Sequence, residues 1–263
     1  MIVGKPGSGK TTFIKYLALQ AISGKLSNPY VPIFVSLHDV SISHSKLREE
    51  MDNEFIVAGL RGPSEFVTNL LKSGKCLILL DGLDEVSEDR NDAITREIIN
   101  LSEEFHLNKF VVTCRTGVYY KPFHHFVDME VADFGEPEIR TFVQNWFSED
   151  SDPRRASDCT NIIISHPPIQ ELASTPLLLT LLCLAYQSGS PLLQVRFQMY
   201  NNAIEELLEK WDERRRIRRD RFYKSMVNKL KLALLSYVAA VTFEQEEYSF
   251  TRTRLTEVVA AFL

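Results

Sequence analysis

The segment Gly4-Lys5-Pro6-Gly7-Ser8-Gly9-Lys10-Thr11-Thr12 lies near the start of the chain. It matches the phosphate-binding pattern GxxxxGK[ST] at every fixed position. Its glycines allow the backbone to curl so that successive N–H groups point at one polyphosphate. Residues 12–21 are predicted to form a helix, whose N-terminus would direct unsatisfied N–H groups at the same anion. We therefore predict a nucleoside triphosphate site in which Lys10 reaches the outer phosphates and the Thr11 hydroxyl ligates Mg²⁺.

A second motif supplies carboxylates for the metal side of this site. Residues 76–80 are continuously apolar, which is typical of a strand buried on both faces of a parallel sheet, and Asp81-Gly82-Leu83-Asp84-Glu85 follows them. A carboxylate at the C-terminal end of such a strand lies in the crevice where open α/β sheets bind ligands. Asp81 is thus predicted to hold Mg²⁺ directly or through water. Either Asp84 or Glu85 could orient or deprotonate the attacking water, and the sequence leaves that choice open.

A third element ends in a basic residue. Residues 109–114 form another apolar, β-branched run, predicted to be a strand, and Arg115 follows it. The planar guanidinium suits phosphate oxygens. Arg115 is therefore either a contact to the terminal phosphate or a surface residue that closes the strand.

The wider pattern of the chain divides into two parts. Strand patterns recur over residues 32–37 and 126–131, and helical patterns over residues 65–71 and 94–105. Strands alternating with helices indicate βαβ units and a parallel sheet. After about Glu136 helical patterns dominate, over residues 138–147, 168–187, 196–213 and 223–242. We predict an α/β module, a parallel sheet flanked by helices, followed by a helical part.

Composition narrows the partners and the compartment. The chain has 263 residues, a net charge of −5 and ordinary hydrophobic content, so bulk electrostatic attraction to nucleic acid or to an anionic membrane is not expected. Its four cysteines show no metal-ligand spacing, which favours reduced, buried thiols in a cytoplasmic protein. The longest apolar runs are too short to span a bilayer. Residues 214–221 are strongly basic; they either contact an acidic partner or form a solvated connection between helices.

Together these residues resemble the NACHT family of signal-transduction ATPases, the STAND class. The resemblance rests on GKPGSGKTT, LILLDGLDEV, VVTCRTGVYY and ELASTPLLLTLLCLAY, and it extends from Gly4 to about Phe250. The later segments LLEKWDERR and TFEQEEYSF look most like bacterial members.

This resemblance implies a domain plan and a mode of action. It implies a P-loop NTPase domain over residues 1–134, a small helical domain over 135–190 and part of a winged-helix domain over 191–263. The adenine would lie against Pro176. ADP would lock a closed monomer, exchange for ATP would permit self-oligomerisation, and slow hydrolysis would reset the molecule. A role in bacterial sensing, such as innate immunity or antiviral defence, is the expectation.

Two departures and two competing hypotheses accompany this interpretation. The strand before the phosphate loop is only Met1-Ile2-Val3, although it is expected to be central in the sheet. The chain also stops inside the winged-helix resemblance, so a fragment of a larger switch is expected.

The alternatives are an AAA+-like motor or processing ATPase with robust turnover, and a scaffold in which nucleotide only stabilises assembly.

Overall fold

The computed structural model of the chain describes residues 1–117, 123, 125–150, 152, 154–188, 228–247 and 250–262. The chain divides into two compact units. The first unit comprises Met1–Phe134 together with Thr175–Leu177, and the second comprises Gly135–Ser174 and Leu178–Leu263.

The first unit is built on a parallel sheet of five strands in the order β2-β3-β4-β1-β5. The strands are β1 (Ile2–Gly4), β2 (Val31–Ser36), β3 (Cys76–Asp81), β4 (Lys109–Arg115) and β5 (Met129–Glu130). The register pairs Gly4 with Arg115 and Leu80 with Val112. The carboxyl ends of β1, β3 and β4 therefore meet at one edge of the sheet, where the three predicted motifs are brought together.

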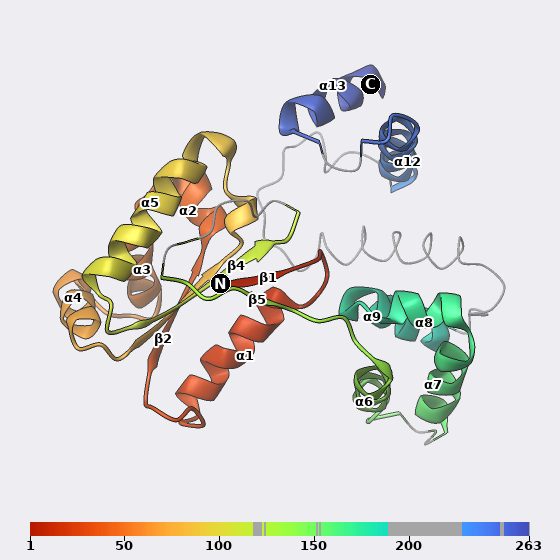
Figure 1. Cartoon of the computed structure of the whole chain (residues 1–263), viewed down its shortest axis with the longest axis horizontal. Coiled ribbons are helices and arrows are strands. Elements are labelled where there is room, and N and C mark those ends of the chain that lie inside the picture. Colours follow the sequence, from red (N-terminus) through yellow and green to blue (C-terminus); the bar gives the residue numbers. More distant parts are fainter. Residues whose placement is uncertain are drawn as a thin grey trace. The chain divides into compact units, whose positions relative to one another are not determined.

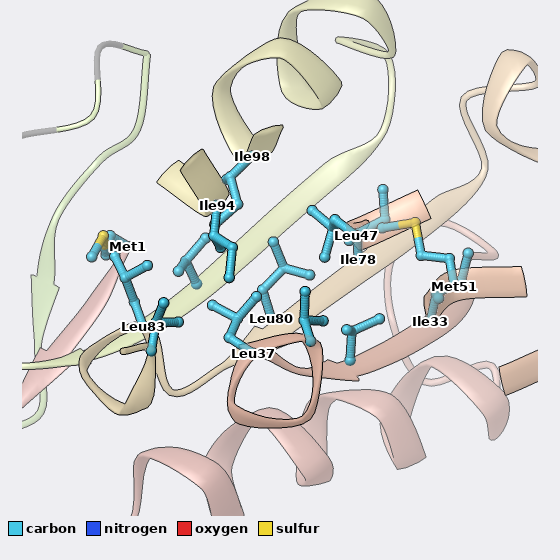
Figure 2. Close-up of a cluster of buried hydrophobic side chains, with 14 of the residues drawn as sticks. Met1, Ile33, Leu37, Leu47, Met51, Ile78, Leu80, Leu83, Ile94 and Ile98 are labelled. Carbon is cyan, nitrogen blue, oxygen red and sulfur yellow. The ribbon is translucent and has the colours of Figure 1, made fainter. Parts of the chain in front are cut away.

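Helices cover both faces of this sheet (Figure 1). They are α1 (Lys10–Ile22), α2 (Leu37–Ser43), α3 (Leu47–Val57), α4 (Ser64–Lys72) and α5 (Glu88–Glu104), with a short 3₁₀ turn η1 (Leu83–Glu85) after β3. On one face, Ile78 and Leu80 pack with side chains from α2, α3 and α5 (Figure 2). On the other face, Leu77 and Leu79 pack with Ile14 of α1. Because β3 is buried on both sides, its continuous apolar run is the pattern expected of an inner parallel strand.

The second unit is helical in the part that the structure describes. Its helices are α6 (Glu136–Trp146), α7 (Arg155–Ser165), α8 (Pro167–Ala173), α9 (Pro176–Gln187, whose first two residues are grouped with the first unit), α12 (Asn228–Glu244) and α13 (Arg252–Phe262). Helix α7 packs against α6 and α8, and α13 against α12. Over the described residues no single helix meets the length and hydropathy needed to cross a membrane, although the bent pair α8 and α9 meets them together.

Several predicted elements need correction. The single helix predicted over 168–187 is wrong: α8 and α9 are bent by 120°, because Pro176 lacks an N–H and disfavours the helical region for the residue before it. The strand predicted over 126–131 shortens to Met129–Glu130. The strand before the phosphate loop is an inner strand of the sheet, as expected, because it pairs with β4 on one side and with the short β5 on the other.

Other predicted elements were incomplete or cannot be compared. Helices α2, α3, α7 and α13 were not predicted, and α5 begins at Glu88 instead of residue 94. The helix predicted over 196–213 and the basic segment 214–221 lie outside the described residues. The boundaries proposed for the helical and winged-helix domains stay predictions.

Candidate nucleotide-binding site

The phosphate loop (residues 4–12) connects β1 to α1 by a tight backbone turn. Gly7 and Gly9 have φ values of 75° and 89°, in the left-handed region that favours glycine. The backbone N–H of Ser8 donates to the Lys5 carbonyl at 3.2 Å. A Cβ atom on Gly4 would lie 2.7 Å from Ser8 Oγ, which leaves no room for a larger residue. The loop thus has the glycine-dependent curl that its sequence predicts.

Two features of this loop offer hydrogen-bond donors to an anion. Gly9, the N-cap residue of α1, has no side chain that could cap the N–H groups of the first helical turn. Ser8 Oγ is buried and has no hydrogen-bond partner among the described residues. A buried hydroxyl without a partner is costly unless a ligand satisfies it. Both observations fit an oxygen-rich anion such as a polyphosphate.

Lys10 is one of two basic residues of the loop, and its ammonium lies against the loop backbone. Its Nζ donates to the carbonyl of Gly4 at 2.7 Å and to that of Lys5 at 3.0 Å, so the side chain folds back across the loop. Burial lowers the pKa of the Lys10 ammonium, while the nearby Asp84 carboxylate acts in the opposite direction. A phosphate at this position would restore the charged form that burial disfavours.

The metal side of the site centres on Asp81 at the end of β3. Its Oδ1 accepts a hydrogen bond from the Thr11 hydroxyl at 3.1 Å, which joins the two residues predicted to hold Mg²⁺. The same oxygen accepts a second hydrogen bond, from the Thr113 hydroxyl of β4, at 2.6 Å. A carboxylate and a threonine hydroxyl are oxygen donors of the kind that Mg²⁺ prefers. These residues therefore fit a Mg²⁺ ion bound together with a nucleotide.

Asp84 and Glu85, both in η1, differ in environment. The Asp84 side chain is only 6% exposed; Oδ1 accepts from the backbone N–H of Arg115 at 3.0 Å, and Oδ2 lies 2.8 Å from Arg115 Nε. Glu85 is 42% exposed, and its Oε1 lies 4.0 Å from Arg115 Nη2. Asp84 is thus committed to Arg115, whereas Glu85 retains a solvent-accessible carboxylate.

The remaining residues predicted to bind the nucleotide lie in the loop or beside it. Thr175–Leu177 belongs to the first unit, and Leu177 N–H donates to the Gly7 carbonyl at 3.3 Å. Pro176 Cγ lies 4.0 Å from the position of a Cβ on Gly9. Lys5 forms an exposed ion pair with Asp133 at 2.6 Å, and Pro6 and Thr12 are exposed. The structure thus places every predicted site residue around the loop or at the adjoining sheet edge, while the roles assigned to them stay predictions.

Sequence reasoning missed Thr113. It is 1% exposed and lies one position beyond Val112, the register partner of Leu80, so it lies beside Asp81. The signal in the sequence was a hydroxyl within the mostly apolar strand β4, which neighbours β3, the strand that ends in Asp81. A buried hydroxyl of that kind needs a partner, and an adjacent carboxylate is the nearest polar group that the sheet provides.

This fold and site define a P-loop NTPase domain. The chain belongs to the NACHT family, because the family model of the NACHT domain matches residues 1–150, more than half of its 263 residues. No curated protein matches the sequence.

Several solved structures are similar to the chain. The Aeropyrum pernix ORC1 protein in complex with DNA shares 17% identity at a TM-score of 0.48, with 99% of this chain and 76% of that chain covered. A Walker-type ATPase of Pyrococcus abyssi shares 10% identity at a TM-score of 0.48, with 98% of this chain and 82% of that chain covered. The C. elegans protein PCH-2 shares 15% identity at a TM-score of 0.44, with 81% of this chain and 61% of that chain covered.

Proposed function

We propose that this chain binds ATP and ADP with Mg²⁺ and acts as a NACHT-type signalling switch with slow hydrolysis. The observation that carries the proposal is the hydrogen bond from Thr11 to Asp81, which brings the phosphate loop and the acidic strand into one site. Membership of the NACHT family supports nucleotide binding at this loop. A bound nucleotide and its Mg²⁺ supply the phosphoanhydride bond and the charge that polarises it.

The geometry supports Glu85, not Asp84, as the general base. A base must reach a water molecule with a free carboxylate oxygen. Both oxygens of Asp84 are engaged by Arg115, and the side chain is buried. Glu85 has the accessible carboxylate. We propose that Asp84 instead orients Arg115, whose guanidinium would contact the terminal phosphate.

A switch function requires that the nucleotides stabilise different arrangements of the molecule. A ligand shifts such an equilibrium only by its differential affinity for the two states. We propose that ADP favours a closed monomer and that ATP favours self-association, with hydrolysis as the reset. A bacterial sensing or defence role and a cytoplasmic location belong to the same proposal; the four buried free cysteines fit a reducing compartment.

The test is to measure bound nucleotide and turnover on the full chain. Nucleotide released from the purified protein is identified by chromatography, ADP affinity is measured by calorimetry with Mg²⁺, and steady-state hydrolysis is followed by phosphate release. The proposal expects tightly held ADP and turnover well below the ~10 s⁻¹ of a median enzyme. Many turnovers per second would favour a motor instead, and binding without hydrolysis would favour a scaffold.

Substitution of Lys10 tests where the nucleotide binds. Lys10→Ala is expected to abolish nucleotide retention, because the ammonium that reaches the outer phosphates is removed. Lys15→Ala is the matched control: Lys15 is exposed on the same helix, with Nζ 5.5 Å from the Phe34 ring centroid, and lies outside the loop. Equal affinity for ADP in the two variants would place the nucleotide elsewhere.

A further inference from the structure

Thr113 occupies a position that connects the metal-side carboxylate to the turn that follows it. Its Oγ1 lies 2.6 Å from Asp81 Oδ1 and 2.8 Å from the backbone nitrogen of Gly82. Gly82 has a φ of 83° and begins the η1 turn, which carries Asp84 and Glu85. One buried hydroxyl thus contacts both the end of β3 and the start of the turn.

The direction of these two hydrogen bonds is fixed by the atoms involved. The Gly82 N–H can only donate, so the Thr113 oxygen must accept there. The single hydroxyl proton is then free for the Asp81 carboxylate, which can only accept while ionised. The hydroxyl therefore cannot rotate without losing a bond, and it presents its proton to one oxygen of Asp81.

The consequence concerns the orientation of the carboxylate. Oδ1 of Asp81 receives both described hydroxyl protons, from Thr11 and Thr113. In the described part of the chain, Oδ2 accepts no such bond, and it is the oxygen left to face a cation or its water. Two donors on one oxygen restrict rotation of the carboxylate about its own bond, whereas a single donor would leave it freer.

We propose that Thr113 is a positioning residue that orients Asp81 for Mg²⁺, an inference that rests on the proposed function of this site. Residues that hydrogen-bond to metal-ligating carboxylates set the orientation of those ligands, and their loss costs about 10- to 100-fold in metal affinity. On this proposal Thr113 acts through Asp81 and is not itself a ligand of the ion.

The experiment compares the Mg²⁺ requirement of nucleotide binding in matched variants of the full chain. A fluorescent ADP analogue is titrated in EDTA, and Mg²⁺ is then titrated at saturating analogue. Thr113→Val removes the hydroxyl and is expected to raise the half-saturating Mg²⁺ concentration by about 10- to 100-fold, with affinity in EDTA unchanged. Thr113→Ser keeps the hydroxyl and should restore the wild-type Mg²⁺ requirement.

Thr160→Val is the matched control. Thr160 is also buried and also donates from its hydroxyl, to the Ala156 carbonyl at 2.7 Å, but it lies in α7 of the second unit. It should leave the Mg²⁺ requirement unchanged. If Thr113→Val fails to fold, Thr113→Cys provides a weaker donor, and an intermediate Mg²⁺ requirement is expected.

The outcomes separate the inference from the proposed function. A wild-type protein that binds no analogue would overturn the proposed function and the inference with it. A wild-type protein that binds, with Thr113→Val needing no more Mg²⁺ than Thr160→Val, would overturn the inference alone. Equal losses of affinity with and without Mg²⁺ would assign Thr113 a purely structural role and would also overturn it.

Discussion

Removing the Asp84 carboxylate should destabilise the protein through the loss of its contacts with Arg115. The Asp84 side chain is 6% exposed; it accepts a hydrogen bond from the Arg115 backbone N–H at 3.0 Å and forms an ion pair with the guanidinium at 2.8 Å. A hydrogen bond to a charged group contributes about 1.5–3 kcal/mol, and the ion pair contributes less because the Arg115 side chain is 47% exposed. Asp84→Ala should therefore lower the free energy of unfolding by about 2–4 kcal/mol.

A double-mutant cycle isolates the side-chain part of this interaction. Arg115→Ala removes the guanidinium but keeps the backbone N–H, which still donates a hydrogen bond to Asp84. Urea unfolding of Asp84→Ala, Arg115→Ala and the double variant, followed by circular dichroism, should give a coupling energy of about 1–2 kcal/mol. A coupling energy below about 0.5 kcal/mol, the usual error of additivity, would refute the assignment of Asp84 as the partner of Arg115.

An exposed acid–base pair provides the control for that cycle. Asp152 and Arg154 lie 3.6 Å apart with both side chains largely exposed. Exposed pairs of this kind contribute about 0–1 kcal/mol, so Asp152→Ala should change stability little. A loss equal to that of Asp84→Ala would show that the measured effect follows from charge removal in general.

Two further predictions concern the second acid and the buried thiols. Glu85→Gln should block hydrolysis while nucleotide retention and stability stay close to wild type. Stability should change little because Glu85 is partly exposed and its contact with Arg115, at 4.0 Å, is weak. If Glu85→Gln still hydrolyses ATP and Asp84→Asn does not, the assignment of the base is reversed. Burial raises the pKa of the Cys76 and Cys114 thiols from 9.0 to about 11, so the unfolded chain loses these protons first. The contribution of these thiols to the free energy of unfolding should then be fully present below pH 9 and should be lost between pH 9 and about 11. Urea midpoints across that range measure it, and Cys76→Ala with Cys114→Ala should flatten the decline.

The inner strands and the phosphate loop could be predicted because their sequences carry local signals. A parallel strand buried on both faces reads as an unbroken apolar run, and residues 76–80 have that pattern. The loop is fixed by glycines and a Lys-Thr pair at set spacing. Since strand ends in a parallel sheet share one edge, the motifs at the ends of β1, β3 and β4 could be expected to meet.

What could not be predicted depends on contacts between segments distant in sequence. Leu37 was predicted to extend β2, but it begins α2, where the Ser36 hydroxyl accepts from Asp39 N–H and the Leu37 side chain is buried. Propensity cannot distinguish these two uses of one leucine, because packing decides between them. The pairing of Asp84 with Arg115 likewise depends on the register between neighbouring strands.

Asp81, at the end of β3, and Asp84, in the η1 turn, have different environments because β4 presents a different group to each. To Asp81 it presents a hydroxyl, which fixes the carboxylate without neutralising it and leaves its charge available for a cation. To Asp84 it presents a guanidinium, which consumes the charge in an ion pair. On the proposed function, the residue types at positions 113 and 115 of β4 leave Asp81 for metal binding and commit Asp84 to orienting Arg115. Changing the neighbours of the two acids should therefore alter their behaviour even when the acids themselves are kept. Removing the Thr113 hydroxyl should weaken Mg²⁺ binding although Asp81 is intact. Removing the Arg115 side chain should leave the buried Asp84 carboxylate without its ion-pair partner, and it should not create a second metal ligand.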